Sequence, residues 1–275
     1  MRSYIIFFIV ACVGLCELKA QTYEESIAKS YEYSDAGDWP ASEESLKAAM
    51  RLEPAHPLNF SLLTNLGTIQ RRQGKTEEAL QSYSAALGQM PNNKMILVNR
   101  AELYTEMGEF ENAIFDYNTV LINAPTDVQG LYNRGLLYIK TGEYILAQSD
   151  FELIIENDKD AFWGRFGYAI LEKARGNYVD SEVIFNYLVD TYPNNMRVYE
   201  ERAELLFLTK RNIRAMSDLN KVFAAVEEPS AEMHMLRGRI KLAQNEKESA
   251  AIDFKKAREL GYDEKTVERL LKECL

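Results

Sequence analysis

The sequence predicts an all-α fold in which about seven helix hairpins stack into a solenoid and one further helix closes its C-terminal end. The first observation is a small residue that recurs at spacings of 37, 34, 34, 34, 34 and 35 residues. These residues are Ser30, Gly67, Ala101, Gly135, Ala169, Ala203 and Gly238. A period of about 34 residues is typical of stacked helix hairpins, each too small to bury its apolar face alone.

The second observation is a pair of positions that keeps a fixed offset from each of these residues. Twelve residues further on stands Ala or Ser, and four residues after that stands a large apolar residue. The small set is Ser42, Ala79, Ala113, Ala147, Ser181, Ala215 and Ala250, and the large set is Leu46, Tyr83, Tyr117, Phe151, Phe185, Leu219 and Phe254. Small residues let two helices approach closely, so that side chains of one fill the grooves of the other.

Glycine and proline mark the ends of the predicted helices. Five glycines fall between the two halves of a unit, where a helix ends in a left-handed residue: Gly37, Gly74, Gly108, Gly142 and Gly176. Four prolines fall between units, where a helix must stop: Pro54, Pro91, Pro125 and Pro193.

These residues resemble the tetratricopeptide repeat family over nearly the whole stretch from Tyr23 to Asp263. The clearest unit contains Leu63, Leu66, Gly67, Gly74, Ala79, Tyr83, Ala86 and Pro91. The resemblance implies a right-handed superhelix whose first helices line a concave, partner-binding surface. Lys210 and Asn245 depart from the pattern because they stand where five units have glycine, and we expect looser turns there.

The predicted solenoid spans residues 21–275. Its repeats are expected at 23–56, 60–93, 94–127, 128–161, 162–195, 196–229 and 231–264, followed by a cap helix at 264–275. In that last helix, Val267, Leu270, Leu271 and Cys274 are spaced to form one apolar stripe. Such a stripe is typical of a terminal helix that covers the last exposed hydrophobic face.

The N-terminus predicts a signal peptide over residues 1–20. A basic start, Met1-Arg2-Ser3, precedes an apolar run, and Ala20 offers a small residue for cleavage. We therefore expect a periplasmic or otherwise exported protein. The alternative is a lipoprotein signal at Cys12, which would anchor the chain to the outer membrane and bring it to a membrane surface.

The composition favours a binding protein over an enzyme. The formal net charge of −10 disfavours nucleic acid as a partner. The two histidines, His56 and His234, lie far apart and have no second ligand at metal spacing, so no metal, cofactor or catalytic residue is predicted. The expected partner is a protein or peptide, and the sequence does not indicate the oligomeric state.

The resemblance places a candidate partner-binding groove in the fourth and fifth units. Six apolar or aromatic residues stand at successive groove positions, with two cations beside them: Tyr132, Leu136, Ile139, Trp163, Phe166, Ile170, Lys173 and Arg197. An exposed patch of this kind marks a partner site, with aromatic anchors. Lys173 and Arg197 are expected to select an acidic flank on the partner. The alternative is that these side chains pack within the solenoid.

Two functions follow as hypotheses. The first is a non-catalytic adaptor of the bacterial cell envelope that holds a protein segment in its groove. The second is a structural subunit of an outer-membrane assembly, such as a secretion or peptidoglycan-associated machine, which uses its convex face and edges.

Overall fold

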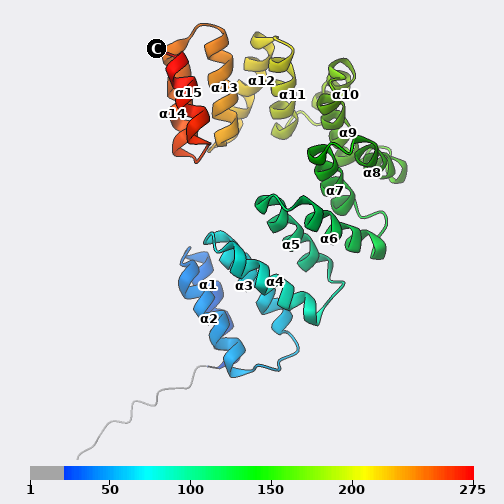
Figure 1. The fold of residues 1–275 in the computed structure, drawn as a ribbon, viewed down its shortest axis with the longest axis vertical. Helices are drawn as coiled ribbons and strands as arrows, with labels where there is room; N and C mark the ends of the chain where they lie inside the picture. Colours follow the sequence, from blue (N-terminus) through cyan, green and yellow to red (C-terminus); the bar gives the residue numbers. More distant parts are fainter. Residues whose placement is uncertain (1–21) are drawn as a thin grey trace, which may run out of the picture. The chain divides into compact units, whose positions relative to one another are not determined.

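The computed structural model describes residues 22–275, so the predicted signal peptide and Cys12 lie outside the described residues. Fifteen α-helices make up this part of the chain (Figure 1). Their bounds are α1 Tyr23–Asp35, α2 Trp39–Leu52, α3 Asn59–Arg72, α4 Thr76–Gln89, α5 Lys94–Met107, α6 Phe110–Asn123, α7 Val128–Thr141, α8 Tyr144–Asn157, α9 Phe162–Arg175, α10 Tyr178–Thr191, α11 Met196–Leu208, α12 Asn212–Ala225, α13 Ala231–Ala243, α14 Lys247–Glu259 and α15 Glu264–Glu273. The predicted fold class, an all-α solenoid of helix hairpins with a final capping helix, is confirmed.

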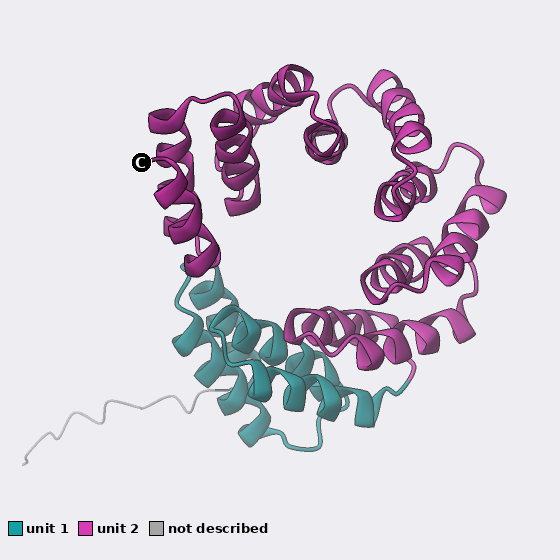
Figure 2. Cartoon of the chain, turned by 45° about the horizontal axis from the view of Figure 1, so that its top comes forward, with its two compact units in different colours: residues 1–91 teal, residues 92–275 magenta. Residues whose placement is uncertain are grey.

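The helices divide into two compact units (Figure 2). Unit 1 ends at Pro91 and contains α1–α4, and unit 2 runs from Asn92 to Leu275 and contains α5–α15. In both units each odd-numbered helix from α1 to α13 packs against the helix that follows it, as the hairpin pattern predicts. In unit 2, the first helices of successive hairpins also contact one another: α7 with α9, α9 with α11, and α11 with α13.

The core of each hairpin is built where a large residue of the second helix meets a small residue of the first. Phe151 of α8 is fully buried and lies against two glycines, Gly135 of α7 and Gly167 of α9. An added Cβ at Gly135 would stand 2.6 Å from Phe151 Cε1, and one at Gly167 would stand 2.3 Å from it. The single aromatic ring therefore joins its own hairpin to the next one.

The turns inside the hairpins keep one geometry even where glycine is missing. Lys210 and Asn245 take φ values of 61° and 65°, beside 83° at Gly142 and Gly176. The turn at Lys210 closes with a 2.8 Å hydrogen bond from Arg211 N to Leu206 O, and the turn at Gly142 with a 2.7 Å bond from Glu143 N to Tyr138 O. The expectation of looser turns is wrong, because the turn geometry is kept. Lys210 and Asn245 instead adopt a left-handed backbone conformation that is strained for a residue with a side chain.

The final helix covers the end of unit 2. Asp263 caps α15 by accepting a 2.8 Å hydrogen bond from Thr266 N. Val267 and Leu270 are buried against Phe254 and Ala257, and Leu271 and Cys274 pack beside them. Within residues 22–275, no helix combines the length and the apolar character that crossing a membrane requires.

We predict that Gly135→Ala destabilises the protein by about 1–3 kcal/mol, because the new methyl group overpacks the contact with Phe151. The matched control is Gly88→Ala, since Gly88 is helical and an added Cβ there meets nothing within 4 Å. The control should raise stability by roughly 0.5–1 kcal/mol, the gain of alanine over glycine in a helix. Urea denaturation followed by circular dichroism measures both, and an unchanged midpoint in Gly135→Ala contradicts the packing described.

We also predict that Lys210→Gly stabilises unit 2 by roughly 1 kcal/mol, because glycine adopts the left-handed conformation without a Cβ clash. Asn245→Gly should give a smaller gain, since asparagine tolerates this conformation better than lysine. The same denaturation experiment decides the outcome. A lower midpoint for Lys210→Gly would show that the lysine side chain contributes more than its backbone strain costs.

Candidate functional site

The candidate groove residues lie in an aromatic cluster formed by α7, α9 and the end of α10. The ring centroids of Tyr132 and Trp163 are 4.8 Å apart, and Phe162 lies 5.1 Å from both Phe166 and Tyr192. Contacts of this length and geometry are those that aromatic pairs favour. The structure therefore brings together Tyr132, Trp163 and Phe166, as the sequence predicted.

The members of this cluster differ in how much of each side chain remains accessible. Phe166 is only 2% exposed, so it belongs to the core and is not available as an anchor for a partner. Ile170 packs on the same core cluster, whereas Leu136 and Ile139 pack on the neighbouring cluster that contains Phe151. Internal packing thus accounts for Phe166 and for part of the surface of the other apolar residues.

Tyr132 connects these two core clusters. It is half-buried and contacts both of them. Burial raises the pKa of its hydroxyl, with a further rise from the charge of Glu201, so the phenol stays protonated over the physiological range.

The two predicted cations have different roles. Lys173 of α9 binds Glu201 of α11 at 2.6 Å and also pairs with Glu204. Burial lowers the pKa of Lys173, but the two carboxylates outweigh it and the net shift is upward. Lys173 therefore ties α9 to α11 through ion pairs that compensate its charge within the chain.

Arg197 remains on the surface of α11. Its guanidinium lies over the ring of Trp163, 5.6 Å from the centroid. A cation in this position is attracted to the face of the indole ring. Trp163 and Arg197 therefore form one continuous surface between α9 and α11.

An open groove of about 840 Å³ lies next to this pair. Its lining includes Trp163, Tyr192, Met196, Arg197, Glu200 and Val226. A smaller hollow of about 390 Å³ continues beyond Glu200 toward α13, where Glu232, Arg239 and Tyr262 line it. Glu200 lines both, so the two hollows adjoin along α11.

Glu200 stands at the centre of this combined groove. Burial raises the pKa of its carboxyl group, and repulsion from Glu201 raises it further. Both effects disfavour the charged form of Glu200, the first through lost solvation and the second through like-charge repulsion. The groove therefore lies further toward the C-terminus than predicted, along α9, α11 and α13, and its carboxylates were not among the predicted site residues.

A second feature that the sequence analysis missed is a series of arginine–aspartate pairs. In four hairpins an arginine of the first helix binds an aspartate sixteen residues later, at 2.5–2.8 Å in every case. The pairs are Arg100–Asp116, Arg134–Asp150, Arg202–Asp218 and Arg237–Asp253. The repeat period carries this signal, since the arginines recur at the same position of their units.

The fifth unit interrupts this series. Tyr168 and Ile184 stand where the other hairpins of unit 2 have the arginine and the aspartate, and both pack on apolar core clusters. The interruption falls in α9 and α10, the hairpin that contributes Trp163 and Tyr192 to the groove. This hairpin is held by apolar packing where its neighbours use an ion pair.

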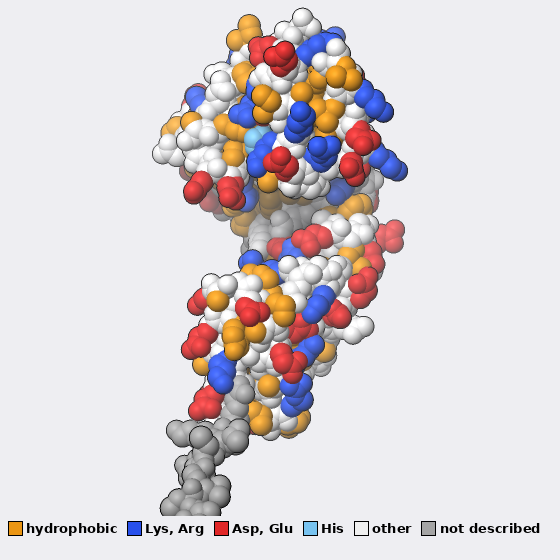
Figure 3. Space-filling model, turned by 90° about the vertical axis from the view of Figure 1, so that its left-hand side faces the viewer, with side chains coloured by type: hydrophobic (Ala, Val, Ile, Leu, Met, Phe, Trp, Pro, Cys, Tyr) orange, Lys and Arg blue, Asp and Glu red, His pale blue; other side chains and the backbone are white. Residues whose placement is uncertain are grey.

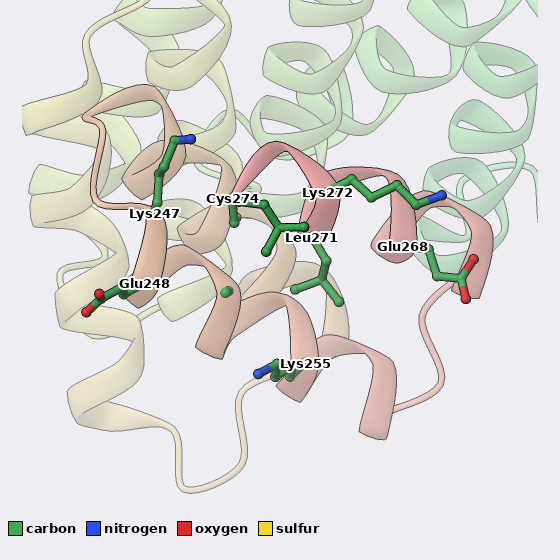
Figure 4. A pocket seen from close by; sticks show the side chains of 9 residues that line it. Lys247, Glu248, Lys255, Glu268, Leu271, Lys272 and Cys274 are labelled. Carbon is green, nitrogen blue, oxygen red and sulfur yellow. The ribbon is translucent and has the colours of Figure 1, made fainter.

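A separate cleft of about 650 Å³ lies between α14 and α15. Leu271 and Cys274 lie in its middle, and charged side chains surround them (Figure 4). Three lysines and two glutamates line it, so its charges are mixed: Lys247, Lys255, Lys272, Glu248 and Glu268. Burial raises the pKa of the Cys274 thiol, which disfavours the reactive thiolate.

Charges of both signs are mixed on the side of the described part that Figure 3 shows, with hydrophobic side chains interspersed among them. Residues 22–275 contain no group of three or more His, Cys, Asp or Glu side chains placed to hold a metal ion.

Comparison with known proteins agrees with this architecture. Models of the tetratricopeptide repeat match residues 27–94, 70–135 and 128–160. No curated protein matches the chain.

Two solved structures share the fold at low identity. The pilF protein of Pseudomonas aeruginosa is 17% identical, with 78% of this chain and 97% of that chain covered and a TM-score of 0.54. Yeast Tom70 is 13% identical, with 93% and 64% covered and a TM-score of 0.63.

A crystal structure of a tetratricopeptide repeat protein from Parabacteroides merdae is far more similar. It is 55% identical, covers 93% of this chain and 99% of its own, and superimposes with a TM-score of 0.82. An identity of this size over almost the full length of both chains shows common descent as well as a common fold. The chain belongs to the tetratricopeptide repeat family.

Proposed function

We propose that this protein is a non-catalytic scaffold of the bacterial cell envelope that holds a segment of a partner protein in the groove along α9, α11 and α13. The observation that carries the proposal is the pair of adjoining hollows that share Glu200. Together they offer an aromatic wall at Trp163 and Tyr192 and carboxylates at Glu200 and Glu232.

The chemistry of this groove suits an extended protein segment better than a small molecule. The groove is open along its length, and Trp163 with its stacked Arg197 supplies the kind of aromatic and arginine anchor that concentrates binding energy at interfaces. Charged groups along the rim then set orientation and association rate. Lys173 is already paired with Glu201 and Glu204. The part of the partner segment that lies near α11 therefore contacts mainly carboxylates.

The envelope location rests on the sequence of residues 1–20, and the bacterial source on the 55% identical relative from Parabacteroides merdae. An apolar run that follows a basic start is typical of export. Export would expose the groove to partners in the periplasm, and lipidation at Cys12 would hold it at the outer membrane.

We predict that Arg197→Glu abolishes capture of the partner and leaves the chain folded, with a modestly lower melting temperature, since it removes the contact with Trp163 and places a carboxylate beside Glu200. The experiment is a pull-down from envelope extract with the purified chain as bait. Arg258→Glu on α14 is the matched control, because it reverses the same charge at an exposed site outside the groove. Equal capture by wild type and Arg197→Glu would refute the groove as the binding site.

The export part of the proposal has its own test. The intact mass of the protein recovered from the envelope should correspond to a chain that begins at Gln21. A mass that includes acyl chains on Cys12 would replace simple cleavage with lipid anchoring. A mass that retains residues 1–20 in a soluble cytoplasmic fraction would contradict export.

A further inference from the structure

Three successive hairpins carry an exposed, branched aliphatic residue at the same position. Ile145 of α8, Val179 of α10 and Ile213 of α12 are each the second residue of their helix. Their exposed fractions are 78%, 76% and 81%, so almost the whole side chain faces water in each case. We call these three residues the aliphatic row.

The aliphatic row occupies a position that elsewhere in unit 2 is charged. The equivalent residues are Glu111 in α6 and Glu248 in α14, and an acidic residue in the first turn is favoured by the helix dipole. With Ile or Val at this position, α8 and α12 have no acidic residue in the first turn, α10 keeps only Asp180, and all three helices expose apolar surface. Burial of the row against a partner would remove this apolar surface from water, which favours association.

The two ends of the row carry opposite charges. Glu143, the N-cap residue of α8, stands next to the row at Ile145 and is exposed. Around Ile213 stand Lys210, Arg211 and Arg214, of which Arg211 and Arg214 bind Glu182 at 2.6 Å and 3.1 Å. One carboxylate against three cations leaves that end positive.

We propose that the aliphatic row binds a second copy of this chain, with the two rows antiparallel about a two-fold axis through Val179. In this arrangement Ile145 meets the partner's Ile213, and Val179 meets the partner's Val179. Glu143 meets the partner's Arg211 and lies near the partner's Lys210. Each contact occurs twice, as an isologous interface requires.

The equal spacing of the row is what makes it complementary to itself. Successive residues of the row are 34 positions apart in the sequence, so the row has one residue in each hairpin. A second copy that runs in the opposite direction therefore presents the same set of side chains with the order of the hairpins reversed. The reversal also places the acidic end on the basic end. Asp180 comes near its own counterpart in the same arrangement, and this repulsion limits the affinity.

This interface lies at the first turn of the second helices, whereas the proposed groove is lined by first helices and by residues that follow the second helices, such as Tyr192 and Val226. Association through the row therefore leaves the groove of each copy open. The proposal does not depend on the function assigned to the groove, and the two fail or succeed in separate experiments.

Sedimentation velocity of the purified chain over a range of concentrations tests the proposal. Wild type should sediment as a dimer, and Val179→Glu should shift it to the monomer because it places two carboxylates at the axis. Ile122→Glu is the matched control, since Ile122 of α6 is 79% exposed and lies outside the row. The control should remain a dimer.

A charge-reversal pair tests the antiparallel arrangement. Glu143→Lys should weaken the dimer by facing a lysine with the partner's Arg211, and the double variant Glu143→Lys, Arg211→Glu should restore it, since glutamate is the N-cap residue of α8 and α14. A wild-type chain that is monomeric at every concentration overturns the proposal. So does a dimer that survives Val179→Glu, that is lost equally in Ile122→Glu, or that the double variant fails to restore.

Discussion

The close contact between a large buried side chain and a glycine, which has no side chain, is the constraint on which the rest of this fold depends. Phe151 occupies space that any side chain at Gly135 or Gly167 would take. The same relation recurs between Tyr83 and Gly67 and between Phe254 and Gly238. Because Phe151 touches the first helix of its own hairpin and of the next, its contacts set both the spacing within a unit and the spacing between units. The groove and the aliphatic row inherit their regular geometry from this contact.

The fold could be predicted because its determinants are periodic and local. Small and large residues at fixed offsets specify the hairpins, and the turns keep their geometry even at Lys210. The candidate site could be predicted only in part. Apolar residues on adjacent first helices contact each other as readily as they contact a partner, and Phe166 packs inward for that reason. The pairing of Lys173 with Glu201 joins different hairpins, so no pattern within one repeat shows it.

The hairpins of unit 2 differ in whether an ion pair joins their two helices, and amino-acid composition does not show this difference. Four hairpins hold a buried aspartate with an arginine, and the fifth replaces both with Tyr168 and Ile184. A buried ion pair stabilises little in net terms but is costly to break on one side, whereas apolar packing tolerates small shifts. The hairpin that contributes the aromatic wall of the groove is therefore the one that lacks this rigid polar link.

The chain of nearest-neighbour contacts has a consequence for how the protein opens. Each hairpin of unit 2 packs mainly on the one before and the one after it, and unit 1 is a separate compact body. A ligand that stabilises one hairpin therefore stabilises the others only through contacts between adjacent hairpins, as in a one-dimensional lattice. Amide hydrogen exchange should report this directly. Occupation of the groove will slow exchange most in α9 to α13, and the effect will decrease with each further hairpin of unit 2.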